Sequence, residues 1–312
     1  MQTNSGSSEP DAYTVTFKVI LALAFFSGIP ALIYEIIWMR MLSHILGSSI
    51  IAISILTATF MLGLSLGSYL FGCFADKVRR YLRLYALIEL GIGATAFLFP
   101  FLITFIKNNK LSVLPFSYSH HTLFIIQRVV FSSLVLLLPT ILMGGTLPVI
   151  SKFIHRNFAN RGKRLGYLYS FNIAGAILGC LLASFIMMEH IGLTGSLLVA
   201  SSVNITIGLG CLLLDHVFRP AGEVADESQE KPIFQRIIDK KSKLKLSFEQ
   251  KMLLLIFGLS GFTALAYEVL WVRMLIFWLG ATVYSFGMIL AVYLGCIAIG
   301  SFIAAALIDK YS

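Results

Sequence analysis

The sequence predicts an all-α polytopic membrane protein, and three observations support this fold class. Of the 312 residues, 58% are hydrophobic and only 12% are charged, whereas about 25% of a soluble domain is charged. The mean hydropathy is +0.87. The apolar residues also form several runs long enough to cross a bilayer, which takes about 20 residues. This composition argues against a soluble globular enzyme and against a disordered chain.

We expect about eight transmembrane helices, because a single segment in lipid satisfies its backbone hydrogen bonds as a helix. The fifth and sixth are free of Asp, Glu, Lys and Arg, and only a short turn at Glu189 and His190 separates them. The predicted spans are residues 18–39, 46–75, 84–106, 122–150, 165–188, 191–214, 250–272 and 282–308.

The chain divides into four parts. A polar N-terminus, residues 1–17, precedes a six-helix transmembrane repeat, residues 18–214. A basic linker, residues 215–249, leads to two helices that begin a second repeat, residues 250–312. The second half of the linker mixes apolar and basic residues, so it is compatible with an interfacial helix on the anionic leaflet or with a solvated basic tether.

The distribution of positive charge predicts the orientation. Eighteen Lys and Arg flank the spans on one side, and four flank them on the other. The positive-inside rule places the basic loops and the N-terminus in the cytoplasm, and we expect an integral protein of a bacterial inner membrane. The lipid bilayer is then the expected partner, and the net charge of +9 reports topology and not nucleic-acid binding.

An internal repeat links the first two spans to the last two. Ser27–Lys77 aligns with Ser260–Lys310 at a constant offset of 233, and 17 of the 51 positions are identical. Both copies have the same orientation, because six spans separate their starts. The second copy stops after two spans, which favours a piece of a longer protein over a natural eight-span protein. The polar identities are Tyr34 and Tyr267, Glu35 and Glu268, Trp38 and Trp271, Arg40 and Arg273, Asp76 and Asp309, and Lys77 and Lys310.

Parallel repeats of six spans resemble the plan of the major facilitator superfamily. The segment Gly72-Cys-Phe-Ala-Asp76-Lys77-Val-Arg79-Arg80 is similar to that superfamily's G-x-x-x-D-[RK]-x-x-R/K loop between spans two and three. The resemblance implies a cytoplasmic loop that belongs to a conformational gate. Asp76 would organise this loop by pairing with Arg79, Arg80 or a basic residue of another loop, and Asp309 would do the same in the second copy.

Four stretches also resemble the membrane region of spermidine synthase-like fused proteins. They are SGIPALIYEIIWMRML, LGLSLGSYLFGCFADK, LPTILMGGTLPVISKF and GYLYSFNIAGAILGCLLASFIMMEHIGLTG. The resemblance implies a membrane module that anchors an aminopropyltransferase-like domain or protein and handles a polyamine. The glycine-rich nucleotide loop of that soluble domain is missing, because the Gly pairs here lie in apolar helical runs. We therefore expect no cofactor and no aminopropyl transfer by this chain.

Two carboxylates of the repeat are the main candidates for a binding site. Glu35 and Glu268 lie in apolar helices, where a carboxylate needs a cavity or a partner. Repeat symmetry would bring them to one cleft, where Tyr34, Trp38, Tyr267 and Trp271 could add cation–π contacts to a small cationic ligand such as a polyamine. The alternative is structural, with Glu35 paired to Arg40 and Glu268 to Arg273 at the outer surface.

Other intramembrane polar residues predict structural roles. Glu89 and Arg128 lie on adjacent antiparallel spans and could form a buried ion pair or a proton relay. Asn172, Gly175 and Gly179 give the fifth span a polar residue and a G-x-x-x-G face for close helix packing. No metal site is expected, because the four Cys lie far apart and His120-His121 has no acidic or Cys neighbour. Three functions stay open: the module described above, a carrier of a small cationic solute, and a non-transporting scaffold.

Overall fold

A computed structural model describes residues 9–46, 50–78, 80–108, 121–157, 161–217, 247–280 and 283–311. Within these ranges the backbone of some residues is described but their side chains are not. Among them are Arg128, Glu268, Arg273, Asp309 and Lys310. The linker, with the interfacial helix or tether expected there, lies almost wholly outside the described residues, as do His120 and Arg79.

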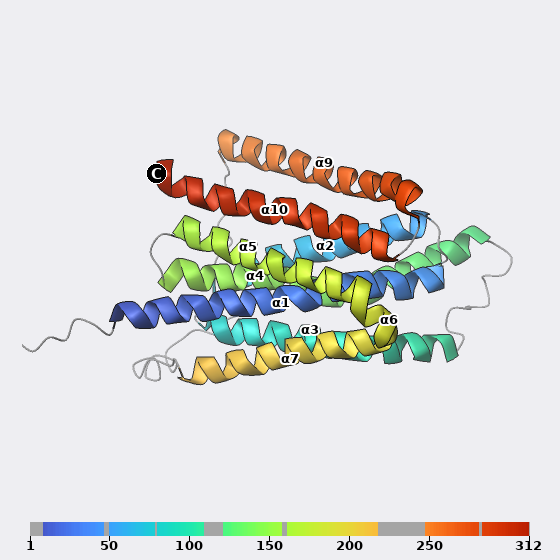
Figure 1. The fold of residues 1–312 in the computed structure, drawn as a ribbon, viewed down its shortest axis with the longest axis horizontal. Coiled ribbons are helices and arrows are strands. Elements are labelled where there is room, and N and C mark those ends of the chain that lie inside the picture. Colours follow the sequence, from blue (N-terminus) through green and yellow to red (C-terminus); the bar gives the residue numbers. More distant parts are fainter. Residues whose placement is uncertain are drawn as a thin grey trace, which may run out of the picture.

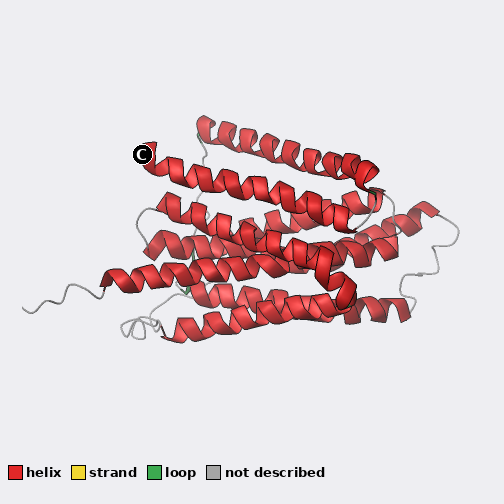
Figure 2. Cartoon of the chain, in the orientation of Figure 1, coloured by secondary structure: helices red, strands yellow, loops and turns green. Residues whose placement is uncertain are grey.

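The described chain is helical, and its eight long helices correspond to the eight predicted spans (Figure 2). The fifth span is α5 followed by a single π-helical turn, Ala183–Met187, and a short α6, Met188–His190. Seven stretches of the described residues are long and apolar enough to cross a membrane, and only α9 lacks such a stretch. The long helices are α1 (Glu9–Leu46), α2 (Ile50–Ala75), α3 (Tyr81–Asn108), α4 (His121–Asn157), α5 (Arg161–Leu182), α7 (Gly192–Val217), α9 (Phe248–Leu279) and α10 (Val283–Tyr311).

Local sequence explains the start of α9 and the turn between α6 and α7. Ser247 and Gln250 form a capping box at the start of α9, in which each side chain bonds to the backbone N–H of the other residue. Gly192 has a φ of +70° between α6 and α7, a conformation that glycine adopts without steric cost. The tight hairpin predicted between the fifth and sixth spans therefore turns at this glycine.

The helices lie side by side along the long axis of the molecule, and the start of α1 and the end of α10 lie at the same end of the bundle (Figure 1). Helix α2 packs on α4, α1 on α5, α3 on α7, and α10 on α5. Glycine makes two of these contacts close: a Cβ on Gly67 of α2 would lie 1.9 Å from the Ile141 carbonyl oxygen of α4, and one on Gly144 of α4 would lie 2.2 Å from the Leu64 carbonyl oxygen. Small residues thus allow backbone-to-backbone packing where no hydrophobic force favours helix association.

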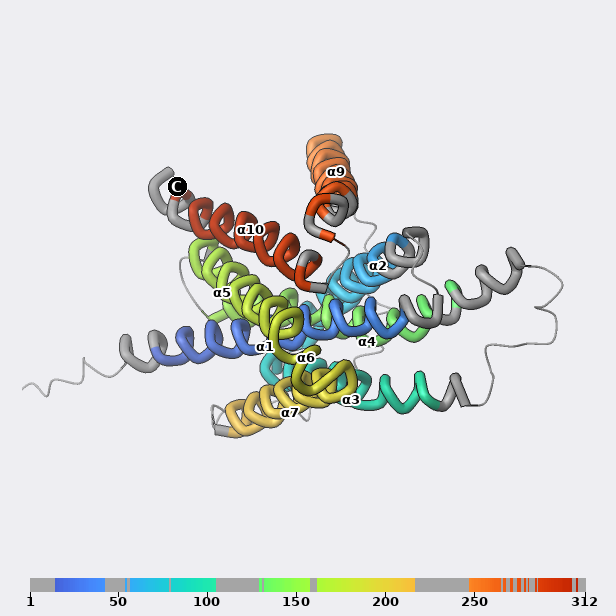
Figure 3. Tube along the Cα trace, turned by 45° about the vertical axis from the view of Figure 1, so that its right-hand side comes forward, coloured from blue at the N-terminus to red at the C-terminus, as the bar shows by residue number. Residues whose placement is uncertain are grey.

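Helix α9 lies at the edge of the bundle. Figure 3 shows α10 lying against α5, with α9 beyond α10 and far from α1. The helix packs on α10, and nearly all of its described side chains are exposed. The first helix of the second repeat therefore has a different environment from α1, which is packed among α5, α7, α2 and α4.

Candidate functional site

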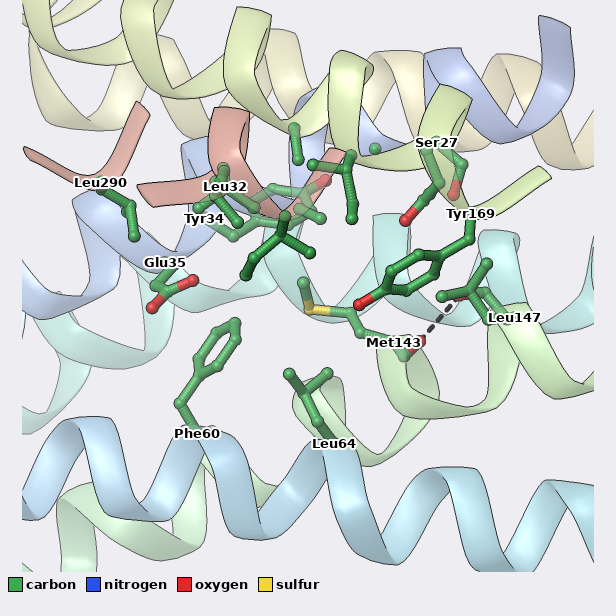
Figure 4. A pocket seen from close by; sticks show the side chains of 18 of the residues that line it. Ser27, Leu32, Tyr34, Glu35, Phe60, Leu64, Met143, Leu147, Tyr169 and Leu290 are labelled. Atoms are coloured by element: carbon green, nitrogen blue, oxygen red, sulfur yellow. Dashed lines mark hydrogen bonds between the residues drawn. The ribbon is translucent and has the colours of Figure 1, made fainter. Parts of the chain in front are cut away.

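A cavity of about 350 Å³ lies inside the bundle, and six helices supply most of its lining. Helix α1 contributes Ser27, Tyr34 and Glu35, and α7 contributes Asn204. Figure 4 shows Phe60 and Leu64 reaching into this space from α2, opposite Tyr34 and Glu35. The remaining lining side chains come mainly from α4 (Met143, Thr146, Leu147), α5 (Tyr169, Asn172, Ile173, Ala176) and α10 (Leu290, Tyr293, Leu294, Ile297).

The internal repeat is visible in this lining. Phe60, Met61 and Leu64 of α2 line the cavity, and so do their counterparts at the offset of 233: Tyr293, Leu294 and Ile297 of α10. The second helices of the two copies therefore turn equivalent faces toward the same space. The first helices differ: α1 lines the cavity as well, whereas no described residue of α9 does.

Glu35 supplies the only carboxyl group of this lining, and no Lys or Arg of the described chain lines it. Glu35 is only 6% exposed. Arg40, its predicted partner, is exposed five residues further along α1, and the pairing of the two stays a prediction. A carboxylate with little access to water is costly to keep ionised unless a cation or hydrogen-bond donors compensate.

Trp38, predicted to join an aromatic cage around the carboxylates, does not line the cavity. This side chain is fully buried, stacks on Tyr34 at 4.9 Å between ring centroids, and stacks on Phe99 at 5.2 Å. Both faces of its indole are therefore occupied by protein. Tyr34 lines the cavity, but its hydroxyl donates a 2.7 Å hydrogen bond to Asn204 Oδ1.

The second copy of the cage does not reach the cavity either. Tyr267 and Trp271 are 61% and 54% exposed on α9, because that helix packs on α10 at the edge of the bundle. In this structure they therefore do not line the cavity with Tyr34, and the predicted cage stays a prediction. The Glu268 and Arg273 side chains lie outside the described residues, so their predicted pairing stays a prediction.

Behind the cavity wall, Glu89 of α3 is fully buried in a hydrogen-bonded network. Ser27 Oγ donates to Oε1 at 2.6 Å, Asn204 Nδ2 donates to Oε2 at 2.5 Å, and the Tyr85 hydroxyl also hydrogen-bonds to this carboxyl. Glu89 thus has three neutral hydrogen-bond partners among the described residues, and its predicted pairing with Arg128, whose side chain is not described, stays a prediction. No signal in the sequence indicates that Asn204 of α7 bonds to Tyr34 of α1 and Glu89 of α3.

Close packing of α5 on α1 occurs at the predicted glycines. A Cβ on Gly175 would lie 1.9 Å from the Phe25 carbonyl oxygen, and one on Gly179 would lie 2.0 Å from that of Ile29. The Asn172 amide donates to the Ala24 carbonyl oxygen at 3.0 Å and also borders the cavity. The same face of α5 therefore fixes the helix contact and forms part of the site.

At the end of the bundle that holds the basic loops, Asp76 pairs with Lys152 of α4. Both side chains are exposed, so this ion pair adds little stability. It connects the α2–α3 turn to the end of α4, in line with the expected pairing to a basic residue of another segment. Lys77 beside it is half-buried, and the Asp309 and Lys310 side chains lie outside the description.

Comparison with known families decides which of the resemblances holds. A model of the Major Facilitator Superfamily matches residues 17–312. The chain belongs to this superfamily. No curated protein and no solved structure gives a significant match, and these comparisons do not support the likeness to spermidine synthase-like proteins.

Membership in the superfamily gives the cavity a functional context. In major facilitator transporters the two halves are parallel repeats, and substrate sites lie near the bilayer midplane where the repeats meet. The cavity found here lies where the two copies of the repeat meet, because α2 and α10 border it from one copy each. Within the described part of the chain, no three His, Cys, Asp or Glu side chains come close enough to hold a metal ion.

Proposed function

We propose that this protein is a carrier for a small organic cation, with the cavity as the solute site and Glu35 as its anionic contact. One observation carries the proposal. A carboxyl group that is only 6% exposed borders a cavity of about 350 Å³ at the contact between the repeats. Cavities of about 300–1,000 Å³ are typical of small-molecule sites.

The rest of the lining favours an amphipathic solute. Leu, Ile, Met, Phe and Ala side chains make up most of the wall, and Tyr169, Thr146 and Asn172 add hydroxyl and amide groups. The Tyr169 hydroxyl is directed into this space in Figure 4. An alkyl chain with an ammonium group would bury its methylene groups against the wall and place its charge beside Glu35. Polyamines have this chemistry, so putrescine and spermidine are the first compounds to test.

The test is equilibrium binding of radiolabelled putrescine and spermidine to the purified chain, followed by uptake into proteoliposomes. We expect saturable binding that Glu35→Gln weakens about tenfold or more, since a hydrogen bond to a charged group contributes about 1.5–3 kcal/mol. Glu189→Gln is the matched control, because Glu189 is exposed on α6 and outside the cavity. Equal binding by the Glu35→Gln chain and the parent, or no saturable binding of any organic cation by the folded protein, would overturn the proposal.

The anchoring function rests on the sequence resemblance alone, and no contact of the described residues adds to it. It predicts a stable complex with an aminopropyltransferase-like protein and no uptake into proteoliposomes. The same proteoliposome experiment therefore separates the two functions.

A further inference from the structure

The network around Glu89 joins a buried carboxyl group to the cavity wall. Ser27 and Asn204 line the cavity, and both also donate to Glu89, one to each carboxyl oxygen. Tyr34 extends the network by donating to Asn204 Oδ1. Glu89 itself does not line the cavity and is 0% exposed. Any change in its charge therefore reaches the cavity through these neighbours.

The charge environment of Glu89 contains no described cation. The titratable groups that face it are Tyr34 from α1, Tyr85 from its own helix and Cys211 from α7. Helix α4, which also packs on α3, carries described basic residues near its cytoplasmic end, where Lys152 pairs with Asp76; the Arg128 side chain of α4 is not described. Neutral donors only partly compensate a buried carboxylate, and binding one proton removes its charge.

Protonation would reverse one hydrogen bond without moving a helix. With Glu89 ionised, both carboxyl oxygens accept, and the Ser27 hydroxyl must direct its hydrogen to Oε1. When a proton taken from water binds Oε1, Glu89 becomes the donor and Ser27 Oγ the acceptor. The hydroxyl hydrogen of Ser27 then leaves Oε1 and has two other directions, the Tyr85 hydroxyl beside it and the cavity, where it can bond to a solute.

We propose that Glu89 is a proton-binding site and that the Ser27 hydroxyl transmits its protonation state to the cavity. The group bound is a proton, so the inference does not depend on which solute the cavity takes. It adds to the proposed carrier function a means by which pH changes the donors presented to that solute. If polyamines do not bind, the proton-site proposal is unaffected. If Glu89 does not bind a proton, the carrier proposal is unaffected.

The first experiment observes the carboxyl group directly by infrared difference spectroscopy of the purified chain between about pH 5 and about pH 9. We expect a carbonyl-stretch band from a protonated carboxyl group whose intensity changes with pH. The band should disappear in Glu89→Gln and persist in Glu35→Gln and in Glu249→Gln, since Glu249 is exposed at the start of α9. A spectrum that Glu89→Gln leaves unchanged would overturn the proposal.

The second experiment tests transmission with Trp38 as the reporter. Trp38 stacks on Tyr34, which is part of the network, and the other two tryptophans, Trp271 and Trp278, are exposed on α9. In a chain with Trp271→Phe and Trp278→Phe, the emission of Trp38 should change with pH at the midpoint of the infrared band. Emission that stays constant while the band titrates would rule out transmission.

Ser27→Ala keeps both experiments informative if Glu89→Gln fails to fold. This variant removes the donor to Oε1 and leaves the carboxyl group in place. We expect both midpoints to move together away from those of the parent, because the ionised form loses a hydrogen bond. Midpoints that coincide with those of the parent would contradict the role given to Ser27.

Discussion

Asn204 holds the buried network together, because its amide accepts from Tyr34 and donates to Glu89. Replacing it with Leu leaves two buried polar groups without this partner, and each such group costs about 1–3 kcal/mol. We therefore expect Asn204→Leu to lower the free energy of unfolding by about 3 kcal/mol, and Tyr34→Phe to lower it by about 1 kcal/mol. Denaturant unfolding in detergent micelles measures both values.

Ser202→Ala is the control on the same helix. The Ser202 hydroxyl is exposed and donates to the Leu198 carbonyl oxygen of its own helix, so its loss should change stability by less than about 0.5 kcal/mol. Similar effects for Asn204→Leu and Ser202→Ala would show that the network does not contribute to stability.

At the scale of single residues, sequence identified the charged groups but not their surroundings. Glu35 and Glu89 were predictable as candidates, because a carboxyl group in an apolar helix is costly without a cavity or partner. Their partners were not predictable, since Asn204 lies 115 positions from Glu89 and an amide gives no signal of what it faces. Trp38 shows the same limit, because its spacing from Glu35 is compatible with a ligand cage and with the aromatic stack that the fold forms.

At the scale of helices, the contact between α1 and α5 depends on glycine. A Cβ on Gly175 would meet the Phe25 carbonyl oxygen at 1.9 Å, and backbone cannot rotate away as a side chain can. We expect Gly175→Ala to separate the helices and lower the free energy of unfolding by about 2 kcal/mol. Gly210→Ala in α7 is the matched control, because nothing lies within 4 Å of a Cβ there; it should be neutral or slightly stabilising.

The internal repeat supplies a second matched comparison, between Trp38 and Trp271. They occupy equivalent positions, but one is fully buried on α1 and the other is 54% exposed on α9. Trp38→Ala should cost about 3 kcal/mol or more, and Trp271→Ala less than about 1 kcal/mol. Equal losses in thermal stability would mean that α9 is packed in solution as tightly as α1.

Span positions were predictable to within a few residues at most helix ends, because bilayer thickness fixes the length of each apolar run. Ends that extend beyond the apolar run were missed: α1 begins at Glu9 and α9 continues to Leu279. The π-helical turn at Ala183–Met187 was missed as well. It lies where α10 crosses, with Gly287 against Ser184, and hydropathy carries no information about such a contact.

For the whole molecule, the repeat predicted the parallel plan but not the asymmetry of its two copies. Equivalent faces of α2 and α10 border one cavity, as symmetry requires. The first helices differ, because α1 is surrounded by α2, α4, α5 and α7 whereas α9 contacts α10. Sequence identity between copies therefore predicted shared helix geometry, and the neighbours present in the fold decided which copy is buried.

Orientation is the prediction that concerns the whole molecule, and its basis is the charge of the loops. Eighteen Lys and Arg against four place the α2–α3 turn and the end of α4 in the cytoplasm, and the α6–α7 hairpin would then face outward. In a chain whose four Cys are replaced by Ser, Glu189→Cys and Asn157→Cys put single thiols at exposed positions of the two ends of the bundle. A membrane-impermeant maleimide added to intact cells should label Glu189→Cys, and Asn157→Cys should react only after the membrane is permeabilised. The reverse pattern would invert the topology and place Asp76 and Lys152 on the outer side, where they could not belong to a cytoplasmic gate.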